Sequence, residues 1–220
     1  MKPTRLLAFV FAALLAACAT PPEAPLRVKI LAINDFHGNL KTPSGGIRIA
    51  DPADRTKTVV VPAGGAEHLA SAVAELKAKN PNHVFVAAGD LVGASPLLSS
   101  LFHDEPTVES LSAMGLEASA VGNHEFDQGF DDLTGRVRTL WGGGDAAAGD
   151  PYTLGANVYL KGTGTPALPE YTVEETGGVR VAFIGTVTED TATMVSPDGI
   201  ADIEFGDQLE AANRVAAEIS

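Results

Sequence analysis

Three short blocks of polar residues each follow an apolar segment of this 220-residue chain. Asp35 and His37 follow the first segment, Asp90 follows the second, and Asn123 with His124 follows the third. Carboxylate and amide oxygens, together with imidazole nitrogens, suit divalent ions such as Mn, Zn, Co, Mg or Fe. In open α/β sheets, ligands bind in the crevice at the carboxyl ends of the strands. The three blocks therefore predict a metal site at that edge of a sheet.

Each of these residues also has an ordinary structural alternative. Asp35 or Asp90 could cap a turn or a loop, and Asn123 could occupy a turn at positive φ. His124 could be a histidine with a purely structural hydrogen bond, and Glu125 fits a supporting or structural role. The joint occurrence of the three blocks favours the metal site over these alternatives.

The elements that must position these blocks alternate between strands and helices. Period-2 and buried apolar runs predict strands over 27–34, 83–88, 118–121, 152–159, 170–175 and 179–186. Helical spacing predicts helices over 66–79, 96–102, 107–114, 130–140 and 207–220. The last two strands should form a hairpin at Gly177–Gly178. Residues 45–62 are expected to form a polar excursion with one short strand over 58–61. This order predicts an α/β layered domain.

The composition limits the classes of partner. The formal net charge is −13, which argues against a surface for duplex nucleic acid, because such a surface needs Lys and Arg to neutralise phosphates. Bound metal ions can invert the local field, so a small phosphorylated substrate remains compatible with this charge. Apolar residues make up 45% of the chain, and its length fits about one domain with a packed core.

The amino terminus carries the features of an export signal. A basic start and the apolar run Leu6–Leu15 predict a signal peptide over residues 1–17. The sequence Leu-Ala-Ala-Cys, which ends at Cys18, resembles the lipobox of bacterial lipoproteins. That likeness implies lipidation of Cys18, a tether over 18–26, and anchoring at the periplasmic or cell-surface face of a bacterial membrane. An ordinary signal peptide with a chance cysteine is the alternative.

The full sequences around the three blocks are more specific for one protein family than the residue types alone. ILAINDFHGNL, AAGDLVGASPLLSSLF and AVGNHEFDQG resemble the bacterial 5′-nucleotidase and UDP-sugar hydrolase family. That family belongs to the calcineurin-like metallophosphoesterase superfamily, and the likeness covers roughly residues 27–220. It implies a four-layer α/β/β/α sandwich.

The resemblance also implies a role for each metal-binding residue. Asp35 and His37 would bind the first of two divalent metal ions, Asp90 would bridge both ions, and Asn123 would bind the second. His124 would be the catalytic histidine.

Asp127 would orient His124 in that family pattern. Two divalent ions can activate a water molecule and stabilise charge on the phosphoryl oxygens.

The expected activity is metal-dependent release of phosphate from nucleotides by an exported 5′-nucleotidase-type hydrolase. Hydrolysis of 2′,3′-cyclic nucleotides, UDP-sugars or sulfur esters on the same domain is an alternative. A non-catalytic surface lipoprotein is another. No obligate protein partner is expected.

Family members carry further histidines after a later strand, whereas this sequence has none after Asp127. We therefore expect residues 27–220 to form a partial catalytic domain, with the sandwich incomplete at its carboxyl end. A carboxy-terminal nucleotide-specificity domain is expected to be absent, so the activity of the 220-residue chain itself is left open.

Overall fold

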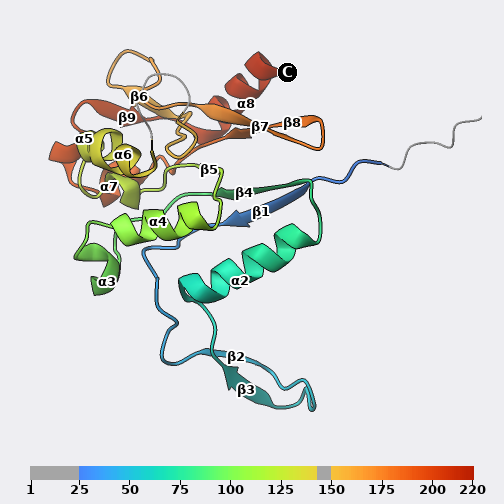
Figure 1. Cartoon of the computed structure of the whole chain (residues 1–220). Coiled ribbons are helices and arrows are strands. Elements are labelled where there is room, and N and C mark those ends of the chain that lie inside the picture. Colours follow the sequence, from blue (N-terminus) through green and yellow to red (C-terminus); the bar gives the residue numbers. More distant parts are fainter. Residues whose placement is uncertain (1–24, 143–149) are drawn as a thin grey trace, which may run out of the picture.

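The computed structural model describes residues 25–142 and 150–220 (Figure 1). The predicted signal peptide, Cys18 and the tether up to residue 24 lie outside the described residues. The strands are β1 (Lys29–Ile33), β2 (Ile47–Ala50), β3 (Thr58–Val61), β4 (His83–Ala87), β5 (Ala118–Ser119), β6 (Val158–Leu160), β7 (Tyr171–Thr176), β8 (Val179–Ile184) and β9 (Ile203–Phe205). The α-helices are α2 (Gly65–Ala78), α3 (Leu97–Ser100), α4 (Glu105–Ala113), α5 (Phe130–Asp132), α6 (Arg138–Leu140), α7 (Thr191–Met194) and α8 (Gln208–Ile219). Three further helical segments are η1 (His124–Phe126) and η3 (Pro197–Ile200), which are 3₁₀, and η2 (Leu133–Val137), which is π-helical.

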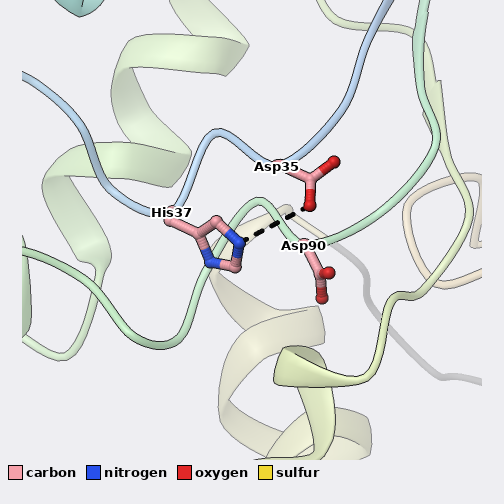
Figure 2. A group of neighbouring side chains, drawn as sticks. All are labelled: Asp35, His37 and Asp90. Atoms are coloured by element: carbon pink, nitrogen blue, oxygen red, sulfur yellow. Dashed lines mark ion pairs between the residues drawn. The ribbon is translucent and has the colours of Figure 1, made fainter.

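A parallel sheet of order β1-β4-β5 carries the three polar blocks at its carboxyl edge. The loops that follow β1 and β4 bring Asp35, His37 and Asp90 together (Figure 2). The β7–β8 hairpin turns at Gly177–Gly178, as the sequence predicts. Strands β6 and β9 form a separate antiparallel pair.

Strand β4 shows why the sheets and helices stack in layers. Its side chains alternate: Phe85 packs with α2 and α4, while Val84 and Val86 face the other way, where they pack with Leu154 and with Phe183 of β8 in the second sheet layer. Helix α8 covers the far side of that second layer, through a separate apolar cluster. Helix, sheet, sheet and helix therefore follow one another, which confirms the expected sandwich (Figure 1). Among the described residues, no helix is both long and apolar enough to cross a bilayer.

Some of the predicted elements differ in extent from the observed ones, and some observed elements were not predicted. The predicted strand over 152–159 is a strand only at β6, because Gly155 and Ala156 donate to the carbonyls of Pro169 and Gly185 rather than continuing one ladder. Residues 45–62 contain β2 as well as β3, paired antiparallel. Strand β9 was not expected, because three residues carry too little pattern. The helix predicted over 130–140 appears as the run α5–η2–α6, with a π-helical middle.

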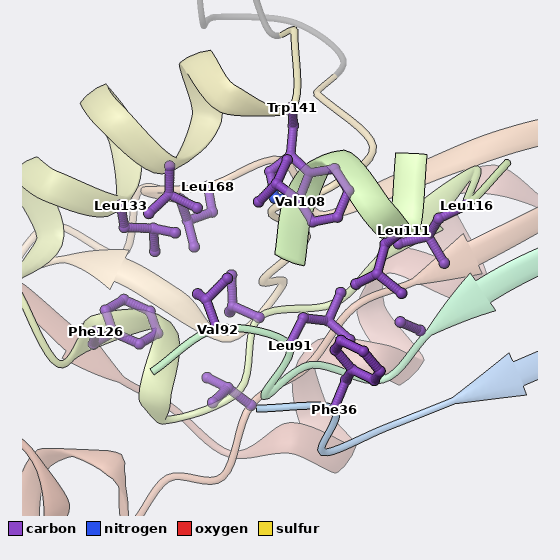
Figure 3. Close-up of a cluster of buried hydrophobic side chains, with 14 of the residues drawn as sticks. Phe36, Leu91, Val92, Val108, Leu111, Leu116, Phe126, Leu133, Trp141 and Leu168 are labelled. Atoms are coloured by element: carbon purple, nitrogen blue, oxygen red, sulfur yellow. The ribbon is translucent and has the colours of Figure 1, made fainter. Parts of the chain in front are cut away.

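The largest apolar cluster lies between the parallel sheet and the helices that cover it (Figure 3). Phe85, Leu111 and Leu133 are fully buried within it. Burying one such side chain contributes about 1.5–3 kcal/mol relative to leaving it exposed. Phe36, Leu91 and Val92 also belong to this cluster. They lie in the loops after β1 and β4, so packing against the core holds the loops that carry the first two polar blocks.

A buried ion pair joins the α5–α6 run to the chain before β6. Nε of Arg138 donates to Asp150 at 3.0 Å, and both side chains are less than a tenth exposed. The carboxylate of Asp150 also accepts from the Thr153 hydroxyl at 2.7 Å and from the backbone N–H of Tyr152 at 2.9 Å. Since Trp141 stacks on Tyr152 with ring centroids 4.8 Å apart, two contacts join the same two segments.

Replacing Asp150 with asparagine should lower the free energy of unfolding by about 3 kcal/mol. This is the lower end of the cost of breaking a buried ion pair, because the asparagine oxygen can still accept at one of the two carboxylate oxygen positions, while the charge attraction between residue 150 and Arg138 is lost. Urea unfolding measures the change. The control is Glu75→Gln, which removes the exposed ion pair with Lys79 and should leave the urea midpoint nearly unchanged, because surface ion pairs contribute little. Equal effects of the two variants would contradict this account.

Candidate metal centre

Hydrogen bonds between two loops bring the first two polar blocks together. Beyond the paired strands β1 and β4, the N–H groups of Asp35, His37 and Gly38 donate to the carbonyls of Gly89, Asp90 and Leu91, at 3.0–3.1 Å. The parallel pairing therefore continues past the strand ends. As a result, side chains 53 to 55 positions apart in sequence face one site.

The donor atoms of Asp35, His37 and Asp90 lie within 4.8 Å of one another (Figure 2). Nε2 of His37 is 3.8 Å from a carboxylate oxygen of Asp35. Asp35 is exposed, while His37 and Asp90 are half-buried, so the cluster opens to solvent on one side. Two carboxylates and one imidazole at this separation form a donor set that suits a divalent ion.

His37 presents a defined nitrogen to this cluster. Its Nδ1 lies 3.0 Å from the carbonyl oxygen of Gly93. A carbonyl can only accept, so Nδ1 carries a proton, and in the neutral imidazole Nε2 has the lone pair that a metal ion would bind. Metal-binding histidines usually donate their other N–H in this way, which fixes the ring orientation.

The backbone of all three cluster residues is in the left-handed region. The φ angles are 52° for Asp35, 45° for His37 and 53° for Asp90. Such a conformation costs about 1 kcal/mol or more at each non-glycine residue and persists where the surroundings impose it, often at functional sites. Capping a turn would not require three strained residues to converge, so the geometry favours the metal site for Asp35 and Asp90.

The third block lies against the second. The backbone N–H of His124 donates to Oδ1 of Asp90 at 2.9 Å. Asn123 directly precedes this N–H and has a φ of −69°, so the alternative of a positive-φ turn residue is wrong. A Cβ on Gly122 would lie 2.2 Å from Oδ1 of Asp90, so only glycine permits this approach.

His124 and Asp127 form the pair that the sequence predicts. Nδ1 of His124 donates to Oδ2 of Asp127 at 2.9 Å, and both side chains are about one-third exposed. This hydrogen bond raises the pKa of His124, while partial burial opposes the rise. The ring of His124 meets that of His37 edge-on, with centroids 4.9 Å apart. The pair therefore lies beside the donor cluster.

Glu125 has a larger structural role than its sequence indicates. Its buried carboxylate accepts from the N–H groups of Asp90 at 2.9 Å, Leu91 at 2.8 Å and Gly122 at 2.6 Å, with a longer contact to Val92 at 3.4 Å. Burial raises the pKa of Glu125, and the hydrogen bonds from Gly122 and Leu91 oppose the rise. Glu125 thus joins the second block to the third. One indication of this role in the sequence is the position of this acidic residue between His124 and the apolar Phe126.

A cavity of about 400 Å³ adjoins the exposed side of the cluster. It lies between the loop after β1 and the start of α2, and Asp35, Asn39 and His68 contribute polar groups to its lining. The described structure thus leaves space beside Asp35 for a molecule larger than an ion.

A donor cluster at the carboxyl edge of a parallel sheet, beside a hydrogen-bonded His–Asp pair, is the arrangement of a metal-dependent α/β enzyme domain. The chain belongs to the family of calcineurin-like phosphoesterases, whose family model matches residues 28–203. It is therefore a member of the metallophosphoesterase hydrolases, a family whose enzymes use divalent metals, as the sequence predicts.

Similar sequences include proteins of several names. The chain is 39% identical over 206 residues to endonuclease YhcR of Bacillus subtilis, covering 91% of the chain and 16% of YhcR. It is 42% identical over 167 residues to an uncharacterised protein of Acinetobacter calcoaceticus, covering 69% of the chain and 80% of that protein. It is 32% identical to a 5′-nucleotidase of Vibrio vulnificus, covering 94% of the chain and 34% of that enzyme. The chain thus spans about a third or less of YhcR and the Vibrio enzyme.

Solved structures share the fold. The NAD nucleotidase of Haemophilus influenzae superposes with a TM-score of 0.67 at 24% identity, covering 87% of the chain and 32% of that protein. The 5′-nucleotidase precursor of Thermus thermophilus gives a TM-score of 0.66 at 23% identity, covering 87% of the chain and 34% of that protein.

Proposed function

We propose that the chain carries the metal-binding part of an exported hydrolase that releases phosphate from nucleotides. The observation that carries this proposal is the convergence of Asp35, His37 and Asp90 beside the His124–Asp127 pair. The 32% identity to a 5′-nucleotidase over nearly the whole chain supports the choice of nucleotides among phosphoesters.

The residues present fit a divalent ion, because two carboxylates and an imidazole with a free nitrogen lie within 4.8 Å. Asp35 and His37 would hold the first ion, Asp90 would bridge two ions, and Asn123 would hold the second. When bound, the ions supply positive charge that stabilises the phosphoryl oxygens and lowers the pKa of water. One oxygen of Asp90 accepts from the N–H of His124, which fixes the carboxylate for this role.

His124 is the proposed catalytic group. Its Nδ1 proton is held by Asp127, so Nε2 is the nitrogen that can reach substrate. The raised pKa favours the imidazolium form, which can stabilise negative charge on phosphoryl oxygen or give its Nε2 proton to the leaving oxygen. Asp127 keeps the ring in this orientation.

Phosphate release from AMP in the presence of Mn²⁺ tests the proposal. The purified protein should release phosphate in a manner that chelation abolishes. The matched variant Asp127→Asn should bind Mn²⁺ like the wild type but turn over about tenfold more slowly, a part of the ~10²–10⁴-fold effect of a general acid. Mn²⁺ binding without release from any nucleotide would refute the nucleotidase proposal and favour a non-catalytic surface lipoprotein.

Phosphodiester hydrolysis is the second candidate, because the chain is 39% identical to part of a protein named an endonuclease. A net charge of −13 disfavours a polyanionic duplex, so 2′,3′-cyclic nucleotides are the better diester probe. UDP-sugars and sulfur esters complete the substrate panel. Preferential turnover of any of these over AMP would assign the domain to that activity instead.

We further propose that residues 1–17 are removed and that Cys18 anchors the protein at the periplasmic or cell-surface face of a bacterial membrane. The lone cysteine after Leu-Ala-Ala supports this proposal, and one relative is named a cell wall protein of Listeria monocytogenes. Replacing Cys18 with serine should move the protein from the membrane fraction to the soluble exported fraction. Immunoblots of fractionated cells measure the shift. An unchanged membrane fraction would contradict lipid anchoring at this residue.

A further inference from the structure

We infer that Asp104 is a positioning residue for His37 and acts through the peptide groups at Gly93. The inference rests on the proposed metal site, because it assigns the residue that orients one of the site's ligands. It adds a residue from outside the three polar blocks, 67 positions from His37 in the sequence.

Asp104 is held in an unusual conformation. Its φ of 65° and ψ of 12° place it in the left-handed region, which Asp and Asn tolerate better than most residues. It occupies the N-cap position of α4, yet its side chain makes no capping hydrogen bond. By contrast, Asp207 caps α8 by accepting from the N–H of Glu210 at 2.8 Å. The Asp104 carboxylate is therefore directed away from its own helix.

Gly93 and Ser99 donate hydrogen bonds to that carboxylate instead. Oδ2 of Asp104 accepts from the Gly93 N–H at 3.1 Å, and Oδ1 accepts from the Ser99 hydroxyl at 2.7 Å. The Ser99 hydroxyl also contacts that of Thr107 at 2.6 Å, within the protein interior. The link to Gly93 uses a different oxygen from the Ser99 network, so the carboxylate can hold the backbone at Gly93 directly.

The backbone at Gly93 contacts both His37 and the His124–Asp127 pair. Its carbonyl accepts the Nδ1 proton of His37 at 3.0 Å. A Cβ at Gly93 would lie 2.6 Å from the carbonyl oxygen of His124 and 2.8 Å from Oδ2 of Asp127, so the backbone packs directly against the His–Asp pair. The hydrogen bond that the Gly93 N–H donates to Asp104 therefore limits how far the carbonyl that accepts from His37 can move. The consequence is control of which imidazole nitrogen faces the metal site.

Two variants of Asp104 separate positioning from folding. Asp104→Gly keeps the left-handed backbone without strain but removes both hydrogen bonds. Asp104→Asn keeps an oxygen for the Gly93 N–H, its NH₂ can donate to Ser99, and asparagine tolerates the same backbone. Ser99→Ala is the matched control, because it breaks the neighbouring network while leaving the link to Gly93.

The first readout is the tautomer of His37 in the metal-free protein, from long-range ¹H–¹⁵N NMR at alkaline pH. Wild type, Asp104→Asn and Ser99→Ala should keep the proton on Nδ1, whereas Asp104→Gly should shift it partly to Nε2. The second readout is Mn²⁺ affinity by calorimetry. Asp104→Gly should weaken it about tenfold, the low end for loss of a ligand's orienting partner.

Asp104→Gly with a wild-type tautomer and affinity would overturn the inference. So would equal effects of Asp104→Gly and Ser99→Ala, because they would indicate a general packing defect. If the wild-type protein binds no Mn²⁺, the proposed function fails. The tautomer measurement still reports on Asp104 in that case, because it needs no metal.

Discussion

Replacing Asp90 with alanine should weaken Mn²⁺ binding by more than about 100-fold. Loss of a partner that only orients a metal ligand already costs about 10–100-fold in affinity, and Asp90 is a proposed ligand itself. Its carboxylate is the part of the donor cluster contributed by the loop after β4. Isothermal titration calorimetry on the metal-free protein measures the loss.

Phosphate release should fall about 10³-fold in the same variant. The bound ions are expected to supply several kcal/mol of transition-state stabilisation, and about 4 kcal/mol corresponds to this factor. The variant also loses the oxygen that accepts from the N–H of His124, so part of the fall could come from a displaced third block.

Asp90→Asn separates these two causes. The asparagine oxygen can still accept from His124, but the residue no longer carries the negative charge that a divalent ion needs. This variant should therefore lose metal affinity nearly as fully as Asp90→Ala. The surface variant Asp131→Ala, on an exposed side chain of α5, is the control and should bind Mn²⁺ normally. Wild-type affinity in Asp90→Asn would remove Asp90 from the metal site.

The residue types of the metal site could be predicted because each block directly follows a strand. Asp35, His37 and Asp90 are local features of the sequence, and the parallel order of β1 and β4 brings their strand ends to one edge. The layers could be predicted for a similar reason, since runs such as HVFVA in β4 are apolar on both faces.

Residues whose role depends on loop conformation could not be predicted. The carboxylate of Asp104 reaches Gly93 only because its backbone is left-handed, and no pattern in the sequence encodes that angle. The hairpin strand β2 reads Ile-Arg-Ile-Ala, an alternating pattern that the flanking glycines and prolines masked. Gly155 was included in a strand because its neighbours are apolar, although its N–H bonds to a separate segment.

Replacing Glu125 with glutamine should lower the free energy of unfolding by about 4 kcal/mol. Both oxygens of the carboxylate accept backbone N–H groups: Oε2 from Asp90 and Gly122, and Oε1 from Leu91 and more weakly from Val92. A glutamine has one oxygen and one NH₂, so its NH₂ must face N–H donors on one side. Each buried donor left unpaired costs about 1–3 kcal/mol, and the remaining hydrogen bonds lose their charge assistance.

Thermal unfolding measures this prediction, with an expected decrease in Tm of about 10 °C for a domain of this size. Glu109→Gln is the matched control, because Glu109 is an exposed glutamate of α4, and its Tm should stay within about 2 °C of wild type. A wild-type Tm for Glu125→Gln would contradict the role of Glu125 in joining two loops. Because the same carboxylate binds the N–H of Asp90, the destabilised variant should also bind Mn²⁺ more weakly than Glu109→Gln below its unfolding temperature. A stable fold and a fixed metal ligand therefore depend on one buried side chain.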